Sequence, residues 1–189
     1  WPHDHDFVGL LDHCGRMLRP LLQGTTSPLE LLFAGQAAQV TAKLYSDSPL
    51  ARYANGHIAD HVARLVARSG GRPLRVLEVG AGTGGTTAAV LPRLPADAQY
   101  WFTDVSDYFF VKAREKFARF PGLSCHLFNL DRSAREQHIA PGFDLIIASN
   151  VIHATADVAQ TLGQLHSLLA PNGVLCLWEM TTPQTWFDI

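Results

Sequence analysis

The sequence has few of the features that would identify whole classes of protein. Only three cysteines occur, and Cys14, Cys125 and Cys176 lie far apart without C-x-x-C spacing, so neither a disulfide framework nor a zinc site is indicated. No apolar run approaches the roughly 18 residues of a membrane helix. The formal net charge of −2 provides no basic surface. We therefore expect no nucleic-acid or membrane partner, and a cytoplasmic location.

The chain also lacks internal repeats, low-complexity tracts, an initiator methionine and a signal peptide. It opens on Trp1-Pro2, so we expect a piece cut from a longer polypeptide. The run His3-Asp4-His5-Asp6 is typical of a solvated chain end, since nothing fixes the geometry of a metal site, and we predict no metal. A hydrophobic content of 47% is enough for one full core.

Residues 1–70 have the pattern of a helical region. Apolar residues recur at helical spacing from Phe7 to Leu22. Ser27-Pro28 and Ser48-Pro49 each place a capping side chain before a proline at the first helical position, and the second helix should end at Ser69-Gly70-Gly71. We expect this region to form a lid or cap, with Tyr53 near the ligand if its helix crosses the ligand edge of the sheet.

From Leu74 onward predicted strands and helices alternate, so residues 71–189 are predicted to form an α/β domain with a doubly wound parallel sheet. The predicted strands are 75–79, 99–102, 123–127, 143–149 and 174–178. Helices are expected at 108–120 and 157–169, with another directly after the first strand. The ligand site of such a sheet lies at the carboxyl ends of its strands.

A glycine-rich turn follows the first strand, in the stretch Glu-Val-Gly-Ala-Gly-Thr-Gly-Gly-Thr-Thr at 78–87. Gly80 and Gly82 can adopt positive φ and bring backbone N–H groups close to a ligand, and Thr86 or Thr87 could cap the next helix. So many glycines in a short segment destabilise the folded state, and they are expected only where the backbone must come close to another group, such as a ligand. We therefore expect a small molecule with a nucleoside to lie across this turn.

Two cofactors compete for the turn, because Gly80, Gly82 and Gly85 fit the dinucleotide fingerprint G-x-G-x-x-G. Glu78 lies at the strand end, where its carboxylate would repel the pyrophosphate of NAD. S-adenosylmethionine has no phosphate and carries an ammonium and a sulfonium, so the same carboxylate favours it. We predict S-adenosylmethionine, and an NAD-dependent protein is the weaker alternative.

Residues at the ends of later strands complete the predicted cofactor site. Asp104 ends the second strand about 20 residues beyond the turn, where an acid accepts from both ribose hydroxyls, although helix capping is an alternative role. Asp131 could accept from the adenine amino group and Leu130 could cover the ring, but a plain turn aspartate is nearly as well supported. Asn150, at the end of the fourth strand, is assigned to the same site.

His153 and Glu179 follow the fourth and fifth strands. In the usual doubly wound order these strands are neighbours, so both side chains emerge together at the ligand edge. A carboxylate hydrogen-bonded to one ring nitrogen fixes the tautomer and raises the basicity of the other nitrogen. The sequence thus predicts a base in position to take a proton.

Several motifs, in this order, resemble the methyltransferase domains of modular polyketide synthases. They are Leu-Glu-Val-Gly-Ala-Gly-Thr-Gly-Gly-Thr-Thr at 77–87, Thr-Asp-Val-Ser at 103–106, Ala-Ser-Asn-Val-Ile-His-Ala-Thr at 148–155 and Trp-Glu-Met-Thr at 178–181, and the likeness extends to 28–33 and 44–53. The resemblance implies a class I, Rossmann-like methyltransferase fold and S-adenosylmethionine as donor. It also implies an acyl carrier protein with a tethered polyketide as partner, alongside the other domains of the synthase.

The same resemblance implies His153 and Glu179 as the catalytic pair, with Glu78, Gly80, Gly82 and Asp104 as cofactor-binding residues. The expected reaction is methyl transfer to the α-carbon of a β-ketoacyl thioester after a base takes its proton. O-methylation of a hydroxyl or enol stays open, and carbon is preferred on family resemblance alone.

A complete sheet of this class has seven strands, and the chain stops soon after the fifth predicted one. The closing strands and part of the acceptor pocket are therefore expected to be missing, unordered or supplied elsewhere. An inactive methyltransferase-like scaffold domain is a further alternative, although the intact Glu78, Asp104, His153 and Glu179 argue against it.

Overall fold

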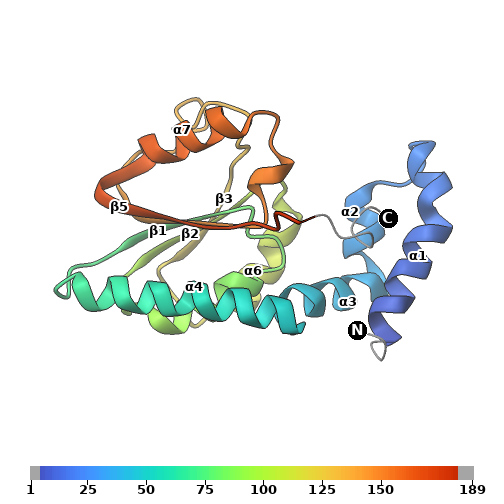
Figure 1. Cartoon of the computed structure of the whole chain (residues 1–189), viewed down its shortest axis with the longest axis horizontal. Coiled ribbons are helices and arrows are strands. Elements are labelled where there is room, and N and C mark those ends of the chain that lie inside the picture. Colours follow the sequence, from blue (N-terminus) through green and yellow to red (C-terminus); the bar gives the residue numbers. More distant parts are fainter. Residues whose placement is uncertain (1–4, 183–189) are drawn as a thin grey trace. The chain divides into compact units, whose positions relative to one another are not determined.

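The computed structural model describes residues 5–182 and divides the chain into two compact units. The first, which we call the helical unit, comprises Trp1–Arg52 with Thr181–Ile189, and the second, the sheet unit, comprises Tyr53–Met180 (Figure 1). The units divide after Arg52, whereas the predicted boundary was at residue 70. The helix Pro49–Arg68 crosses the observed division, and it buries Ala54, Ile58 and Val62 in the sheet unit.

In its described residues, the helical unit contains three helices and the start of a fourth. They are α1 (His5–Leu22), α2 (Pro28–Phe33), α3 (Gly35–Ser46) and α4 (Pro49–Arg68). The Ser27 and Ser48 hydroxyl oxygens accept the backbone N–H of Glu30 and Ala51, so both predicted proline caps are confirmed. The predictions missed α3, whose small residues form only a weak apolar stripe. The chain-end run at 3–6 has its side chains outside the described part.

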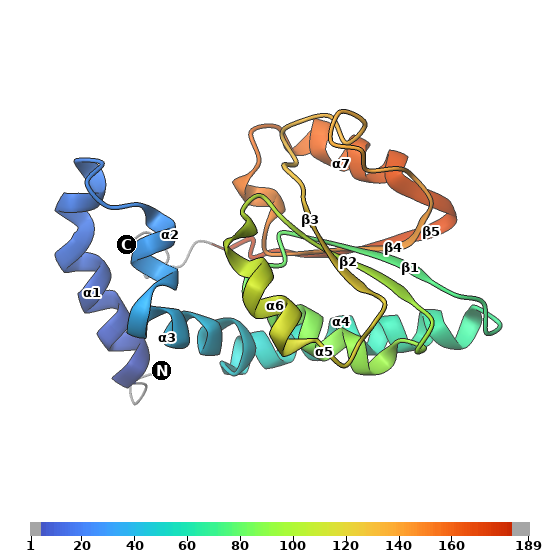
Figure 2. The ribbon, with the colours of Figure 1, turned by 180° about the vertical axis from the view of Figure 1, so that it is seen from behind.

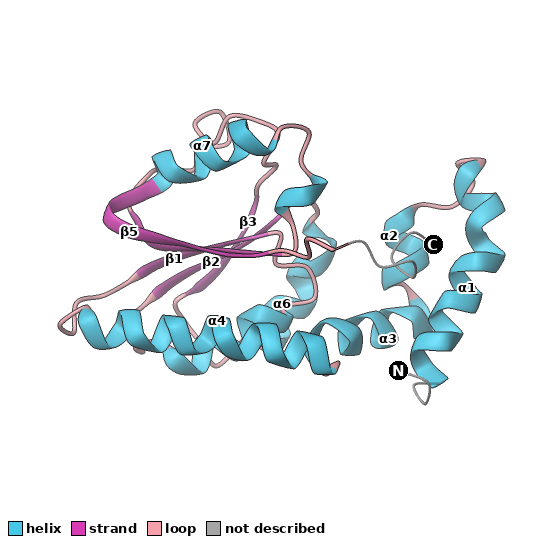
Figure 3. Ribbon diagram, viewed as in Figure 1, coloured by secondary structure: helices cyan, strands magenta, loops and turns pink. Residues whose placement is uncertain are grey.

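The sheet unit is built on five parallel strands (Figure 3). They are β1 (Arg75–Val79), β2 (Gln99–Asp104), β3 (Leu123–Leu127), β4 (Phe143–Ser149) and β5 (Leu169–Trp178), in the spatial order β3-β2-β1-β4-β5. The predicted parallel, doubly wound sheet is confirmed, and β4 and β5 are neighbours as expected. The order changes direction at β1 and β4, where such sheets bind ligands.

Helices cover both faces of this sheet (Figures 1 and 2). On one face lies α7 (Val158–Leu168), and on the other lie α5 (Gly85–Val90), α6 (Phe110–Lys116) and the part of α4 in this unit. Leu77 and Val79 point to the α7 side and pack with Leu165 and Leu168 in the main core. Because side chains alternate along a strand, Glu78 points to the opposite face.

Two predicted elements, the fifth strand and the helix at 108–120, differ from the structure by several residues. Strand β5 begins at Leu169 instead of residue 174, because Pro171-Asn172-Gly173 shifts the register against β4 without ending the pairing. The helix expected at 108–120 is a 3₁₀ turn, Asp107–Phe109, followed by the shorter α6. Short 3₁₀ turns also occur at Leu91–Arg93 and Ile152–Ala154.

In the described residues the sheet ends at β5, so the closing strands of a seven-stranded sheet are not among them. Over residues 5–182, none of the helices is both long enough and apolar enough to cross a membrane.

Candidate functional site

The glycine turn between β1 and α5 adopts the conformation expected of it. Gly80, Gly82 and Gly84 have φ of 61°, 52° and 71°. A Cβ on Gly80 would lie 2.3 Å from Val151 Cγ2, so this glycine is required for packing against the loop after β4. A Cβ on Gly82 would meet only the Gly80 carbonyl oxygen, at 3.9 Å. The backbone at Gly82 is therefore open to close approach by a ligand.

The predicted capping role of Thr86 and Thr87 is wrong, because the N-cap of α5 is Gly84 and both threonines lie inside the helix. The Thr87 hydroxyl instead donates to Glu78 Oε2 at 2.5 Å, and the Thr86 hydroxyl donates to Asn55 Oδ1 at 2.8 Å. These bonds tie the helix after the turn to β1 and to α4. They need tertiary neighbours that no local pattern could reveal.

Glu78 lies beneath the turn, with only 1% of its surface exposed. Tyr100 Oη also donates to Glu78 Oε2, at 2.7 Å. Burial raises the pKa of Glu78 from its ordinary value of 4.5 to about 7, against the opposing hydrogen bonds from Thr87 and Tyr100. The Asp104 charge adds to this increase, and Lys116 reduces it. Its electrostatic influence on a cofactor stays a prediction.

The raised pKa of Glu78 predicts that folding stability depends on pH. The folded protein holds this proton more tightly than the unfolded chain, so the free energy of unfolding should fall as pH rises from 4.5 to about 7. Glu78→Gln should remove this contribution, about 3 kcal/mol, from the pH dependence. Urea unfolding of wild type and variant across this range measures it, with exposed Glu136→Gln as control. Parallel curves for all three proteins would contradict the prediction.

Asp104 ends β2 beside the turn. Its Oδ2 accepts the Gly82 N–H and its Oδ1 accepts the Ser106 N–H, each at 3.0 Å. Burial raises the pKa of this carboxyl group, and the backbone hydrogen bonds oppose the rise. A carboxylate has about four acceptor positions, so Asp104 keeps acceptor capacity for a ligand hydroxyl. Val105, which was not among the predicted site residues, follows Asp104 directly and is 68% exposed. An apolar residue directly after a strand-end acid was the available sign.

Leu130 and Asp131 follow β3. Leu130 is 8% exposed and belongs mainly to the core. Asp131 is exposed, and its Oδ1 accepts the backbone N–H of Ala156 at 2.8 Å. The contact links the loop after β3 to the loop after β4. Adenine binding by either residue stays a prediction.

Asn150 and Tyr53 occupy different surroundings. Asn150 is a non-glycine residue with φ of 55°, and its N–H donates to the Trp178 carbonyl at 2.7 Å, so it shapes the loop that leaves β4. Tyr53 begins the sheet unit with 65% exposure, and its ring meets the His57 ring edge-on at 4.4 Å between centroids. The cofactor role of Asn150 and the lid role of Tyr53 stay predictions.

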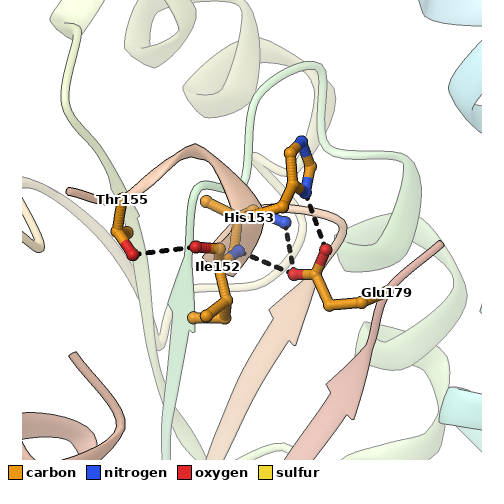
Figure 4. A network of polar contacts seen from close by, with 5 residues as sticks. Ile152, His153, Thr155 and Glu179 are labelled. Atoms are coloured by element: carbon orange, nitrogen blue, oxygen red, sulfur yellow. Dashed lines mark hydrogen bonds and ion pairs between the residues drawn. The ribbon is translucent and has the colours of Figure 1, made fainter. Parts of the chain in front are cut away.

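The structure brings His153 and Glu179 together (Figure 4). His153 Nδ1 lies 2.7 Å from Glu179 Oε2. The other oxygen, Glu179 Oε1, accepts the N–H of Val151 at 2.8 Å and of Ile152 at 2.6 Å. One carboxylate thus holds both the ring and the backbone that carries it.

This geometry determines what the pair can do. With Nδ1 bonded to Glu179, the proton on the neutral ring is held there, and Nε2 is left as the basic nitrogen. The His153 side chain is 56% exposed, whereas that of Glu179 is 15% exposed, so the histidine faces the solvent side of the pair. Among the described residues, no group of three or more His, Cys, Asp or Glu side chains is placed to hold a metal ion.

Comparison with known proteins identifies the family. The sequence profile of the family described as "Methyltransferase domain" matches residues 77–175, from β1 into β5. The chain belongs to this family. The match covers the glycine turn, the acids Glu78, Asp104 and Asp131, and His153, and it ends before Glu179. The methyltransferase fold and the enzyme class expected from the sequence are thereby confirmed.

The chain is similar in sequence to polyketide synthases and in structure to solved methyltransferases. The chain is 34% identical over 195 residues to the non-reducing polyketide synthase adrD of Penicillium roqueforti, and the match covers 100% of the chain but only 8% of that protein. The crystal structure of the CurJ carbon methyltransferase is 35% identical with a TM-score of 0.91, covering 99% of this chain and 50% of that one. The trans-methyltransferase CalH, solved in complex with SAH, is 29% identical with a TM-score of 0.77, covering 93% and 49% respectively.

Proposed function

We propose that this domain transfers a methyl group from S-adenosylmethionine to the α-carbon of a β-ketoacyl thioester held by an acyl carrier protein, in a cytoplasmic polyketide synthase. The observation that carries the proposal is the His153–Glu179 pair at the ligand edge of a methyltransferase sheet. The similar protein from Penicillium roqueforti, a polyketide synthase, supports the class of substrate and the presence of partner domains.

The residues around the glycine turn fit the cofactor. Gly82 leaves room for close approach of a ligand, and Asp104 keeps acceptor capacity for a ribose hydroxyl. Val105 offers an exposed apolar surface for a nucleobase. Beneath the turn, Glu78 adds negative potential when ionised. S-adenosylmethionine supplies a methyl group on a sulfonium, which needs positioning more than acid catalysis.

His153 provides the acid–base chemistry in this proposal. Its Nε2 takes the proton from the acidic α-carbon, and the electron pair left on that carbon forms the new bond to the methyl group. The bond between this methyl group and the sulfonium sulfur would break in the same step, and sulfur would keep its electron pair and leave as a neutral thioether. Glu179 keeps the ring in the required tautomer and stabilises the imidazolium that forms. The same pair could activate an oxygen, and the similarity to a carbon methyltransferase favours carbon.

The position of the added methyl group tests the proposal. The full protein is incubated with a β-ketoacyl carrier protein and S-adenosylmethionine, and the acyl group is analysed by intact mass and fragmentation. We expect a gain of one methyl group on the α-carbon. A methyl group found on oxygen would mean that the acceptor atom is oxygen and not carbon. Tight cofactor binding without methyl transfer to any of several acyl chains would favour an inactive scaffold domain.

A further inference from the structure

The loop that carries His153, residues 150–156, is held at both ends by carboxylates that follow other strands, Glu179 after β5 and Asp131 after β3. Near its start, Glu179 accepts the N–H groups of Val151 and Ile152. At its end, Asp131 Oδ1 accepts the N–H of Ala156 at 2.8 Å. Between these anchors, the Thr155 hydroxyl donates to the Ile152 carbonyl at 2.8 Å, which tightens the turn on which His153 lies (Figure 4).

Asp131 itself stands on a well-supported loop. Gln137 closes that loop, because its Oε1 accepts the Asn129 N–H and its Nε2 donates to the Asn129 carbonyl, both at 2.8 Å. Gln164 of α7 donates to the Leu130 carbonyl at 3.1 Å and accepts the Ala134 N–H at 2.7 Å. The preceding side chain, Leu130, is buried in the core. Asp131 is therefore a fixed anchor for the His153 loop.

We propose that Asp131 is a positioning residue for methyl transfer, which holds the His153 loop through the Ala156 N–H and so fixes where the His153 ring lies. This inference rests on the proposed function of His153. It differs from the adenine contact predicted for the same side chain, because it acts on the proton-transfer step and uses Oδ1 only. The second oxygen stays available to a ligand, so the two roles are separable by experiment.

The test is a pair of variants in the full protein. Asp131→Ala should lower kcat about 10- to 100-fold, because a small displacement of a reacting group is costly. Asp131→Asn keeps one acceptor oxygen for Ala156 and should restore kcat to within about threefold of wild type. An effect confined to KM for S-adenosylmethionine, with kcat unchanged, would overturn the proposal in favour of a cofactor contact alone.

Hydrogen exchange followed by mass spectrometry gives a readout that needs no methyl transfer. In Asp131→Ala the amides of Val151 and Ile152, at the far end of the loop, should exchange faster than in wild type. If the wild-type protein transfers no methyl group, the proposed function fails, and this exchange still decides whether Asp131 holds the loop. Unchanged exchange at these two amides would overturn the inference.

Asp157→Ala is the matched control. Asp157 caps α7 by accepting the Gln160 N–H at 2.9 Å, so its removal also deletes an exposed carboxylate-to-backbone bond close to the loop. It leaves the bond between Asp131 and Ala156 intact. We expect kcat and the exchange of the Val151 and Ile152 amides to stay at wild-type values. Equal effects in both alanine variants would reduce Asp131 to a general stabilising residue.

Discussion

Replacing His153 with alanine is expected to lower kcat for methyl transfer by about 10²- to 10⁴-fold, the usual contribution of a general base. The ring supplies the basic Nε2, and its Nδ1 lies 2.7 Å from Glu179 Oε2. Affinity for S-adenosylmethionine should stay near that of wild type, because the glycine turn is unchanged. Single-turnover kinetics with a β-ketoacyl carrier protein, and calorimetry for cofactor binding, measure the two effects separately.

Glu179→Gln tests the tautomer of His153 directly. Its amide oxygen can still accept from Val151 and Ile152, and this directs the amide NH₂ toward His153 Nδ1. Nδ1 must then act as an acceptor, so the ring carries its proton on Nε2 and the base is lost. We expect a loss of kcat comparable to that of His153→Ala, with little change in stability. His166→Ala, on α7, is the control, and a fully active Glu179→Gln would contradict the assigned tautomer.

Replacing Gly80 with alanine is expected to lower the free energy of unfolding by about 3 kcal/mol, from the cost of a positive φ and of overpacking. The new Cβ would lie 2.3 Å from Val151 Cγ2, in a backbone conformation with φ of 61°. Val151 cannot move freely, since its N–H donates to Glu179. Methyl transfer should therefore fall as well. Urea unfolding at constant pH measures the stability change.

Gly163→Ala provides the comparison for this variant. Gly163 lies on the exposed face of α7, and a Cβ there would meet no heavy atom within 4 Å. Alanine should stabilise that helix by about 0.5–1 kcal/mol. A loss smaller than about 1 kcal/mol for Gly80→Ala would mean that the loop after β4 adapts more easily than its contacts indicate.

The α/β alternation could be predicted because each strand carries its own local pattern. The run 143–149 is almost wholly apolar, as a central parallel strand must be, and the glycines at 80 and 82 mark a turn that side chains would strain. The His153–Glu179 pairing followed from strand order, since β4 and β5 are neighbours. The boundary at residue 70 differed because the pattern of α4 shows an apolar face but not which unit buries it.

By itself, the sequence determined where the five strands and the glycine turn lie, although not where β5 begins, because these features depend on local periodicity and backbone preference. It also determined which acids and which histidine stand at the strand ends. Only the tertiary structure decided the partners of those side chains. Glu78 is buried against Thr87 and Tyr100, and Asp131 accepts from Ala156. The Tyr100 and Ala156 contacts join residues 22 and 25 positions apart in the chain, and hydrogen bonds of that kind are fixed by packing in three dimensions, which no local pattern encodes.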